Sequence, residues 1–157
     1  MIVVADTSPL NYLILIGEIE LLPALYRTVL IPREVHQELL RSEAPAAVRS
    51  WATVLPEWCE VRLPESAPDA GLSELDPGER DAILLALDAG VDLLLMDENE
   101  GRREALRRSL RVAGTIAVLE TAARHGLIDF RSALQRLEQT SFRLSARIRD
   151  EFLKRNP

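Results

Sequence analysis

Short apolar runs alternate along the chain with longer segments in which apolar residues recur every three or four positions. Residues 2–5, 28–31 and 91–96 are such runs, which are typical of strands buried on both faces. Leu10, Leu13 and Ile14 follow helical spacing. We predict strands over 2–5, 28–31, 60–63 and 91–96 and near Val112. We predict helices over 6–17, 18–27, 32–42, 45–54, 76–90, 99–110, 115–125, 129–139 and 144–154.

Capping residues mark several of these ends. Asp76-Pro77-Gly78-Glu79 is typical of a helix start, with Asp at the cap, Pro at the first position and Glu at the third. Gly17 and Gly90 end predicted helices. Residues 64–76 are predicted to be a loop, with no domain boundary, because the next helix and strand complete the same sheet. The alternation predicts one α/β domain over 1–157, with a mainly parallel sheet covered on both faces.

Composition narrows the possible functions. Hydrophobic residues make up 47% of the 157 positions and charged residues 28%, enough for a packed core. Aromatic residues make up only 4%, which argues against a base-stacking sheet. One cysteine, Cys59, excludes an internal disulfide, and two histidines exclude a histidine-rich zinc centre. No apolar run is long enough to cross a membrane, and the first residues lack a signal-peptide pattern, so we expect a cytoplasmic protein.

Charge is divided unevenly along the chain. Residues 1–100 carry a net charge of −13, whereas residues 101–157 carry +7. Such asymmetry is typical of proteins that present a surface to nucleic acid. All basic residues except Lys154 are arginines, which bind phosphate bidentately. The simpler explanation for most single arginines is a solvated helix face.

Acidic residues recur where predicted strands end or where helices flank them. Asp6 and Asp97 each follow a strand, Glu38 lies in the helix after the second strand, and Glu79 and Asp81 lie in the first turns of the helix 76–90. In parallel sheets these strand ends share one edge. Two charges at 4 Å repel by roughly 4 kcal/mol at an effective dielectric near 20, so clustered carboxylates must be protonated, splayed into water or bound to cations. Oxygen ligands select Mg²⁺ or Mn²⁺.

Each acid also has a purely structural explanation. Asp6 and Asp97 could be helix caps, and Glu79 could complete a capping box with Asp76. Asp81 lies two positions beyond Glu79, so the two side chains cannot face one site equally well.

Four segments together resemble PIN-domain nucleases: VVADTSPL, IPREVHQEL, LDPGERDAILLAL and DLLLMDENEGRR. The resemblance covers roughly residues 2–120 in the family's order, with 127–157 as a helical C-terminal extension. It implies a three-layer α/β/α fold and divalent-metal-dependent hydrolysis of RNA, often by a toxin paired with an antitoxin. The GERDAI and MDENEGRR segments resemble a poorly characterised PIN branch more than the VapC-like toxins.

The resemblance assigns roles to individual positions. Asp6 and Asp97 match the family's aspartates at strand ends, and Glu38 matches its helical glutamate. Asp81, directly before AILLA, most resembles the third acid, but the resemblance to the branch makes Glu79 a serious rival, and both are kept as candidates. Asp6, Glu38, Asp97 and Asp81 or Glu79 are therefore the expected ligands of Mg²⁺ or Mn²⁺.

Polar neighbours complete the expected site. Thr7, Ser8 and Asn99 are expected to hydrogen-bond a ligating carboxylate or a water. Arg102 and Arg103, near a predicted helix start, are expected to contact RNA phosphate.

Two other kinds of function are weighed against the nuclease. Haloacid-type phosphatases need an acid where this chain has Ser8, and receivers need a lysine near the site, where none occurs. A PIN scaffold without productive catalysis, which binds RNA or a partner protein, is the second hypothesis.

The first two predicted helices are rich in apolar residues, which would suit a homodimer surface, an antitoxin groove, or simple burial within the fold. These residues are Leu13, Ile14, Ile16, Ile19, Leu21 and Leu22.

Overall fold

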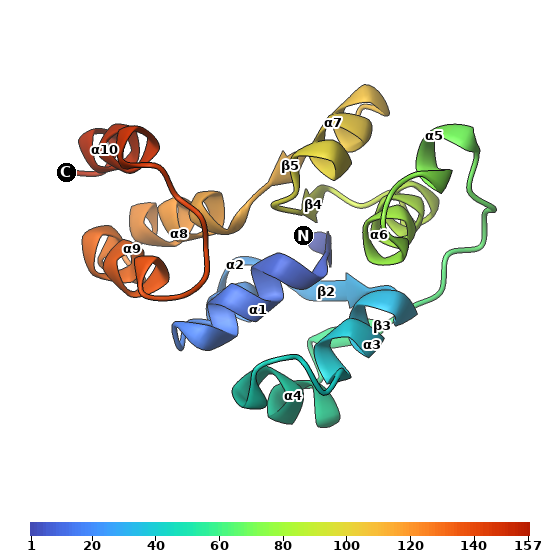
Figure 1. Cartoon of the computed structure of the whole chain (residues 1–157), viewed down its shortest axis with the longest axis horizontal. Helices are drawn as coiled ribbons and strands as arrows, with labels where there is room; N and C mark the ends of the chain where they lie inside the picture. Colours follow the sequence, from blue (N-terminus) through green and yellow to red (C-terminus); the bar gives the residue numbers. More distant parts are fainter.

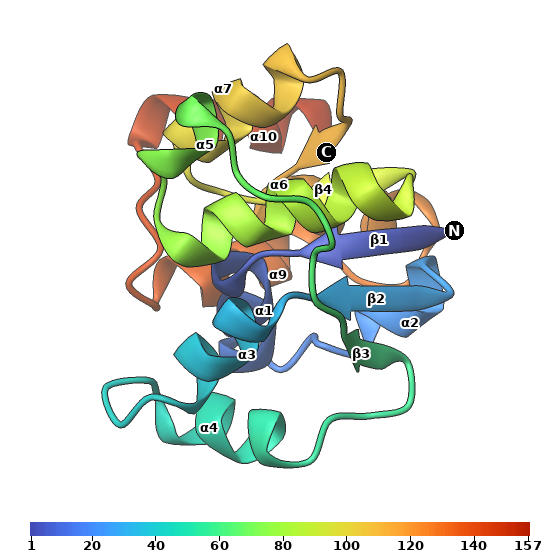
Figure 2. The same ribbon diagram turned by 90° about the vertical axis from the view of Figure 1, so that its right-hand side faces the viewer.

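A five-stranded, wholly parallel sheet lies at the centre of the computed structural model, which describes residues 1–157. The strand order is β3-β2-β1-β4-β5, so the first strand is central. Figure 2 shows β1, β2 and β3 side by side. The strands are β1 (Ile2–Ala5), β2 (Thr28–Ile31), β3 (Cys59–Val61), β4 (Leu93–Leu95) and β5 (Val112–Ala113).

Ten helices cover the two faces of this sheet, which gives the expected three-layer α/β/α architecture (Figure 1). Alternate side chains of β1 point to opposite faces: Val3 and Ala5 join the larger core cluster, and Val4 joins the smaller one. Helices α1, α2, α8 and α9 pack on the first face, and α5, α6 and α7 on the second. The helices are α1 (Thr7–Leu15), α2 (Leu21–Leu25), α3 (Arg33–Leu40), α4 (Ala46–Thr53), α5 (Ala70–Ser73), α6 (Pro77–Ala89), α7 (Asn99–Arg107), α8 (Thr115–Arg124), α9 (Phe130–Glu138) and α10 (Ala146–Arg155).

Two segments differ from the predicted elements. The helix expected over 18–27 is reduced to α2. Residues 18–20 lie in turns instead, because their hydrogen bonds connect residues three apart, as from the Leu21 amide to the Glu18 carbonyl. The stretch 64–76, predicted to be a loop, contains the short helix α5. Asp69 caps α5 by accepting hydrogen bonds from two backbone amides. Arg108, the C-cap residue of α7, donates two further hydrogen bonds to Asp69, of 2.7 and 2.8 Å.

The apolar residues of the first two helices are used within the fold. Four of the six are buried and the other two pack against the larger core cluster, so this excess of apolar residues does not itself require a partner. The buried four are Leu13, Ile16, Leu21 and Leu22, and the other two are Ile14 and Ile19. No helix of the structure has both the length and the apolar character of a membrane span.

The C-terminal helix α10 lies over α8 and α9 (Figure 1). None of its residues is buried, but Phe152 packs against the larger core cluster. Arg155 donates two hydrogen bonds, of 2.9 and 3.0 Å, to the buried carboxylate of Glu120 on α8, and Asn156 donates a third. These bonds fix the end of the chain to the body of the fold.

Candidate active site

The central strand β1 delivers Asp6 to the carboxyl edge of the sheet. The Asp6 amide donates a 2.9 Å hydrogen bond to the carbonyl of Leu95, the last residue of β4, so the ladder continues one residue past β1. Asp6 occupies the N-cap position of α1, yet its side chain makes no capping bond. Its carboxylate is buried and faces a pocket instead, which rules out a simple capping role.

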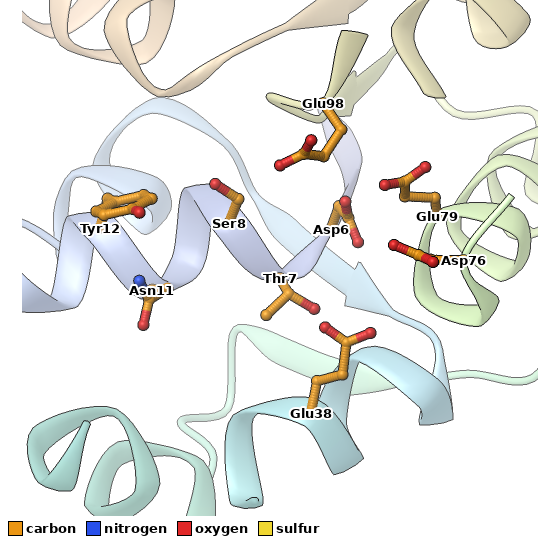
Figure 3. A pocket seen from close by; sticks show the side chains of 9 residues that line it. All are labelled: Asp6, Thr7, Ser8, Asn11, Tyr12, Glu38, Asp76, Glu79 and Glu98. Atoms are coloured by element: carbon orange, nitrogen blue, oxygen red, sulfur yellow. The ribbon is translucent and has the colours of Figure 1, made fainter. Parts of the chain in front are cut away.

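Five carboxylates line this pocket, here called the acidic pocket. In Figure 3 they come from several elements and point toward one another around Asp6. No lysine, arginine or histidine lines the acidic pocket, so the protein itself does not neutralise this charge. Its lining residues are Asp6, Glu38, Asp76, Glu79 and Glu98, with Thr7, Ser8, Asn11 and Tyr12 along α1.

The uncompensated charge shifts the protonation of two acids. Burial, reinforced by the negative charges of Glu38, Asp97 and Glu98, raises the pKa of Asp6 to about 7. Burial also raises the pKa of Glu79 to about 7, with Asp6 as the largest contributing charge. Perturbed carboxyl groups in a cleft are typical of functional sites, because a fold gains no stability from charges that it leaves unpaired.

Asp97 lies beside the acidic pocket and is held in one orientation by three short hydrogen bonds. Its Oδ1 accepts a 2.7 Å bond from the Thr115 amide, and its Oδ2 accepts bonds of 2.6 Å from the Thr115 hydroxyl and 2.8 Å from the Ser8 hydroxyl. The carboxylate therefore stands at the start of α8, not at the start of α7 as a simple cap would. Asp97 connects β4 to both α1 and α8.

The structure separates the two candidates for the third acid. Glu79 is buried and lines the acidic pocket, and Asp76 at the N-cap of α6 makes no side-chain capping bond, so no capping box forms. Asp81 does not line the pocket; its carboxylate accepts a 2.9 Å hydrogen bond from Arg80. Of the two, Glu79 is the residue brought together with Asp6 and Glu38.

Glycines leave room for the acids. A Cβ on Gly78 would lie 2.7 Å from Glu38 Oε1 and 3.5 Å from Asp6 Oδ1. The two carboxylate oxygens are therefore no farther apart than those two distances added together. Gly101 likewise leaves room for Glu79, because a Cβ on Gly101 would lie 3.2 Å from Glu79 Oε2.

The supporting polar residues take different positions. Ser8 bonds Asp97, and the buried hydroxyl of Thr7 has no hydrogen-bond partner although Thr7 lines the acidic pocket. Asn99 lies in an adjoining groove with Asp97. Arg102 lies near Asp97, since an atom of each is within 2.8 Å of the Cβ position of Gly114, whereas Arg103 is exposed and does not line the acidic pocket.

Five residues of the site are not predicted from the sequence, two of which, Asn11 and Tyr12, line the acidic pocket along α1. Asp76 and Glu98 line the acidic pocket, and Thr115 binds Asp97. Asp76 had been explained as a cap. Thr115 follows β5 directly, and β5 ends at the same edge of the sheet, so its position after a strand is the signal that could have identified it.

The donor atoms of the acidic pocket fit a hard divalent cation, and PIN domains generally use such ions. All of its donors are oxygens apart from the amide of Asn11, and the Thr7 hydroxyl is without a partner. As the side chains stand, no three His, Cys, Asp or Glu residues form a ready metal-binding group. Mg²⁺ usually keeps several of its waters and takes only one or two carboxylates directly.

Comparison with known proteins agrees with the fold. The PIN-domain family model DUF3368 matches residues 2–156. A solved structure, a PilT N-terminus domain protein SSO1118 from the hyperthermophilic archaeon Sulfolobus solfataricus P2, is similar with a TM-score of 0.56 at 16% sequence identity, over 78% of this chain and 93% of that one. No curated protein matches the chain. Because the family model spans nearly every residue, this chain belongs to the PIN domain family, whose members are generally nucleases.

Proposed function

We propose that the protein is a divalent-metal-dependent endoribonuclease that hydrolyses RNA phosphodiester bonds and leaves a 5′-phosphate and a 3′-hydroxyl. The observation that carries the proposal is the acidic pocket: buried carboxylates at the carboxyl edge of the sheet, with no basic residue lining it. RNA is the substrate that membership of the PIN family suggests.

Asp6, Glu38 and Glu79 would hold Mg²⁺ or Mn²⁺, one or two of them directly and the rest through bound water, and the ion would supply Lewis-acid polarisation of the scissile phosphate and of the attacking water. Asp97 positions the first turn of α1 through Ser8 and the start of α8 through Thr115. The carboxylates orient the attacking water. Burial around Asp6 restricts bulk solvent and strengthens electrostatic interactions in the site.

The test is cleavage of a labelled single-stranded RNA by the purified protein in a titration of Mg²⁺ and of Mn²⁺. Glu79→Gln and Asp81→Asn form a matched pair, since both remove one negative charge from the same helix turn. We expect Glu79→Gln to lower kcat/KM by at least about 100-fold, the upper end of what loss of an outer-shell partner costs. Asp81→Asn is expected to stay within about threefold, because the partly exposed pair with Arg80 contributes about 0–1 kcal/mol.

Equal losses in the two variants would contradict the assignment of Glu79. No metal-dependent cleavage by the wild-type protein would reject the enzyme itself. Mapping the 5′ end of the product by its susceptibility to a 5′-phosphate-dependent exonuclease checks which bond is broken.

A PIN scaffold that binds RNA or protein without cleaving it is the second candidate. The observation in its favour is that no three acids form a ready metal-binding group. RNA binding without turnover at any concentration of Mg²⁺ or Mn²⁺ would support this function over the nuclease.

A further inference from the structure

The acidic pocket continues along α1 into a second groove, toward the C-terminal segment. Ser8, Tyr12 and Glu98 line both spaces, so the two spaces are directly adjacent. Figure 3 shows Ser8 and Tyr12 one turn apart on the side of α1 that faces Glu98. We call this second space the C-terminal groove, and its wall on the side away from the acidic pocket includes Phe142 and Arg143. Its lining residues are Ser8, Tyr12, Asp97, Glu98, Asn99, Ser141, Phe142 and Arg143.

Arg143 is a positive charge free for a ligand. It is exposed and makes no ion pair, unlike Arg149 and Arg155 farther along the same segment, which pair with Glu138 and Glu120. Arg143 also lines the adjoining hollow that contains Arg102. A phosphate chain leaving the acidic pocket would therefore meet a guanidinium directly beyond the carboxylates.

The two residues before Arg143 are attached to α1 through Tyr12. Tyr12 and Phe142 pack edge to face with their centroids 5.0 Å apart, and the Tyr12 hydroxyl and the Ser141 hydroxyl lie within hydrogen-bond distance, at 3.0 Å. The contacts attach residues 141–143 to α1. They also place aromatic surface in the wall of a polar groove, where an unpaired base can stack but a paired one cannot.

We propose that the C-terminal groove binds single-stranded RNA next to the acidic pocket, with Arg143 bound to a backbone phosphate and Phe142 and Tyr12 in contact with a base. This inference rests on the proposed nuclease function and assigns its substrate contacts to the C-terminal segment. The arrangement joins the acidic first part of the chain, which carries the chemistry, to the basic last part, which binds the substrate.

The experiment measures binding of a short fluorescein-labelled oligouridine by fluorescence anisotropy, in an Asp6→Asn background that keeps the RNA intact. Arg143→Gln is expected to weaken binding about 5- to 10-fold and to reduce the slope of log K against log salt by about 0.7, as loss of one phosphate contact does for single strands. The control is Arg147→Gln, which removes an equally exposed and unpaired charge outside the groove, and it should stay within about twofold.

Phe142→Leu tests the base contact separately. Leucine keeps the apolar packing on α1 but removes the ring, so we expect several-fold weaker binding with the thermal midpoint close to that of the background protein. Unlabelled duplex RNA should displace the probe poorly. Equal losses for Arg143→Gln and Arg147→Gln, no binding of the probe, or efficient displacement by duplex RNA would each overturn the proposal.

The two proposals fail differently. Binding that depends on Arg143, without cleavage by the wild-type protein in Mg²⁺ or Mn²⁺, rejects the nuclease and supports the groove. Cleavage by Arg143→Gln in the otherwise wild-type chain, with KM unchanged, supports the nuclease and rejects the groove.

Discussion

Removing the charge of Asp6 should make the metal-free protein more stable while it abolishes activity. The pKa of this buried carboxyl group rises from 3.8 to about 7, so the folded state binds its proton more tightly than the unfolded state does. Stability is therefore lost as the pH rises from the unfolded pKa through the folded one. The whole titration costs about 4 kcal/mol at 1.36 kcal/mol per pKa unit, and roughly 2–3 kcal/mol of it falls between pH 5 and pH 8.

The Asp6→Asn variant cannot ionise at this position and keeps nearly the same size and shape of side chain. Between pH 5 and pH 8, its free energy of unfolding in EDTA should therefore increase relative to that of the wild type by about 2–3 kcal/mol. Urea unfolding followed by tryptophan fluorescence measures this difference, because Trp51 and Trp58 pack together in partly buried positions. Asp150→Asn, at an exposed carboxylate of α10, is the control.

Divalent metal separates the charge explanation from a packing effect. At pH 8, Mg²⁺ at about 10 times its Kd should raise the wild-type free energy of unfolding by about 1.4 kcal/mol and should change that of Asp6→Asn much less. Parallel pH profiles for the two proteins in EDTA would refute the reasoning, because they would show that Asp6 titrates normally in the folded chain.

Three further predictions concern residues around the pocket. Thr115→Val removes the buried hydroxyl that bonds Asp97 and should lower the free energy of unfolding by about 1–2 kcal/mol and kcat/KM by about tenfold, as measured by urea unfolding and RNA cleavage. Gly78→Ala should displace the flexible end of Glu38 and reduce cleavage by tenfold or more, with little change in thermal midpoint, since alanine also favours the helix. Gly17→Ala should do the opposite: the positive φ of 76° should lower the free energy of unfolding by about 1 kcal/mol, while cleavage is unchanged. A loss of cleavage in this variant would contradict the idea that Gly78 matters because it leaves room for Glu38.

The strand ends and the identity of most acids could be predicted from local pattern. Asp6 and Asp97 follow apolar runs, and parallel strands share a carboxyl edge, so their convergence followed from topology alone. The choice between Glu79 and Asp81 could not be made from topology or local pattern. Residues 82–86 of α6 are all buried, so no single apolar stripe indicates which way the helix faces.

The partners of the acids were less predictable because they depend on contacts distant in sequence. The orientation of Asp97 depends on Thr115, which lies 18 residues later beyond β5. Asp76 and Glu98 stand at or beside helix starts, where a structural cap is the usual explanation for an acid. Only the absence of side-chain capping bonds at both positions shows that neither carboxylate serves as a cap.

Glycine marks the site in a way that backbone conformation does not explain. Gly78, Gly101 and Gly114 all lack a positive φ, so other residues could adopt their backbone conformation. Each instead has a site carboxylate within 3.2 Å of its Cβ position: Glu38, Glu79 and Asp97 respectively. At Gly114 the Nη1 of Arg102 also lies 2.8 Å from the Cβ position, so Asp97 has a basic neighbour. Gly78 and Gly101 leave room for Glu38 and Glu79 in the acidic pocket, which no basic residue lines, and this is the condition under which a cation binds most favourably.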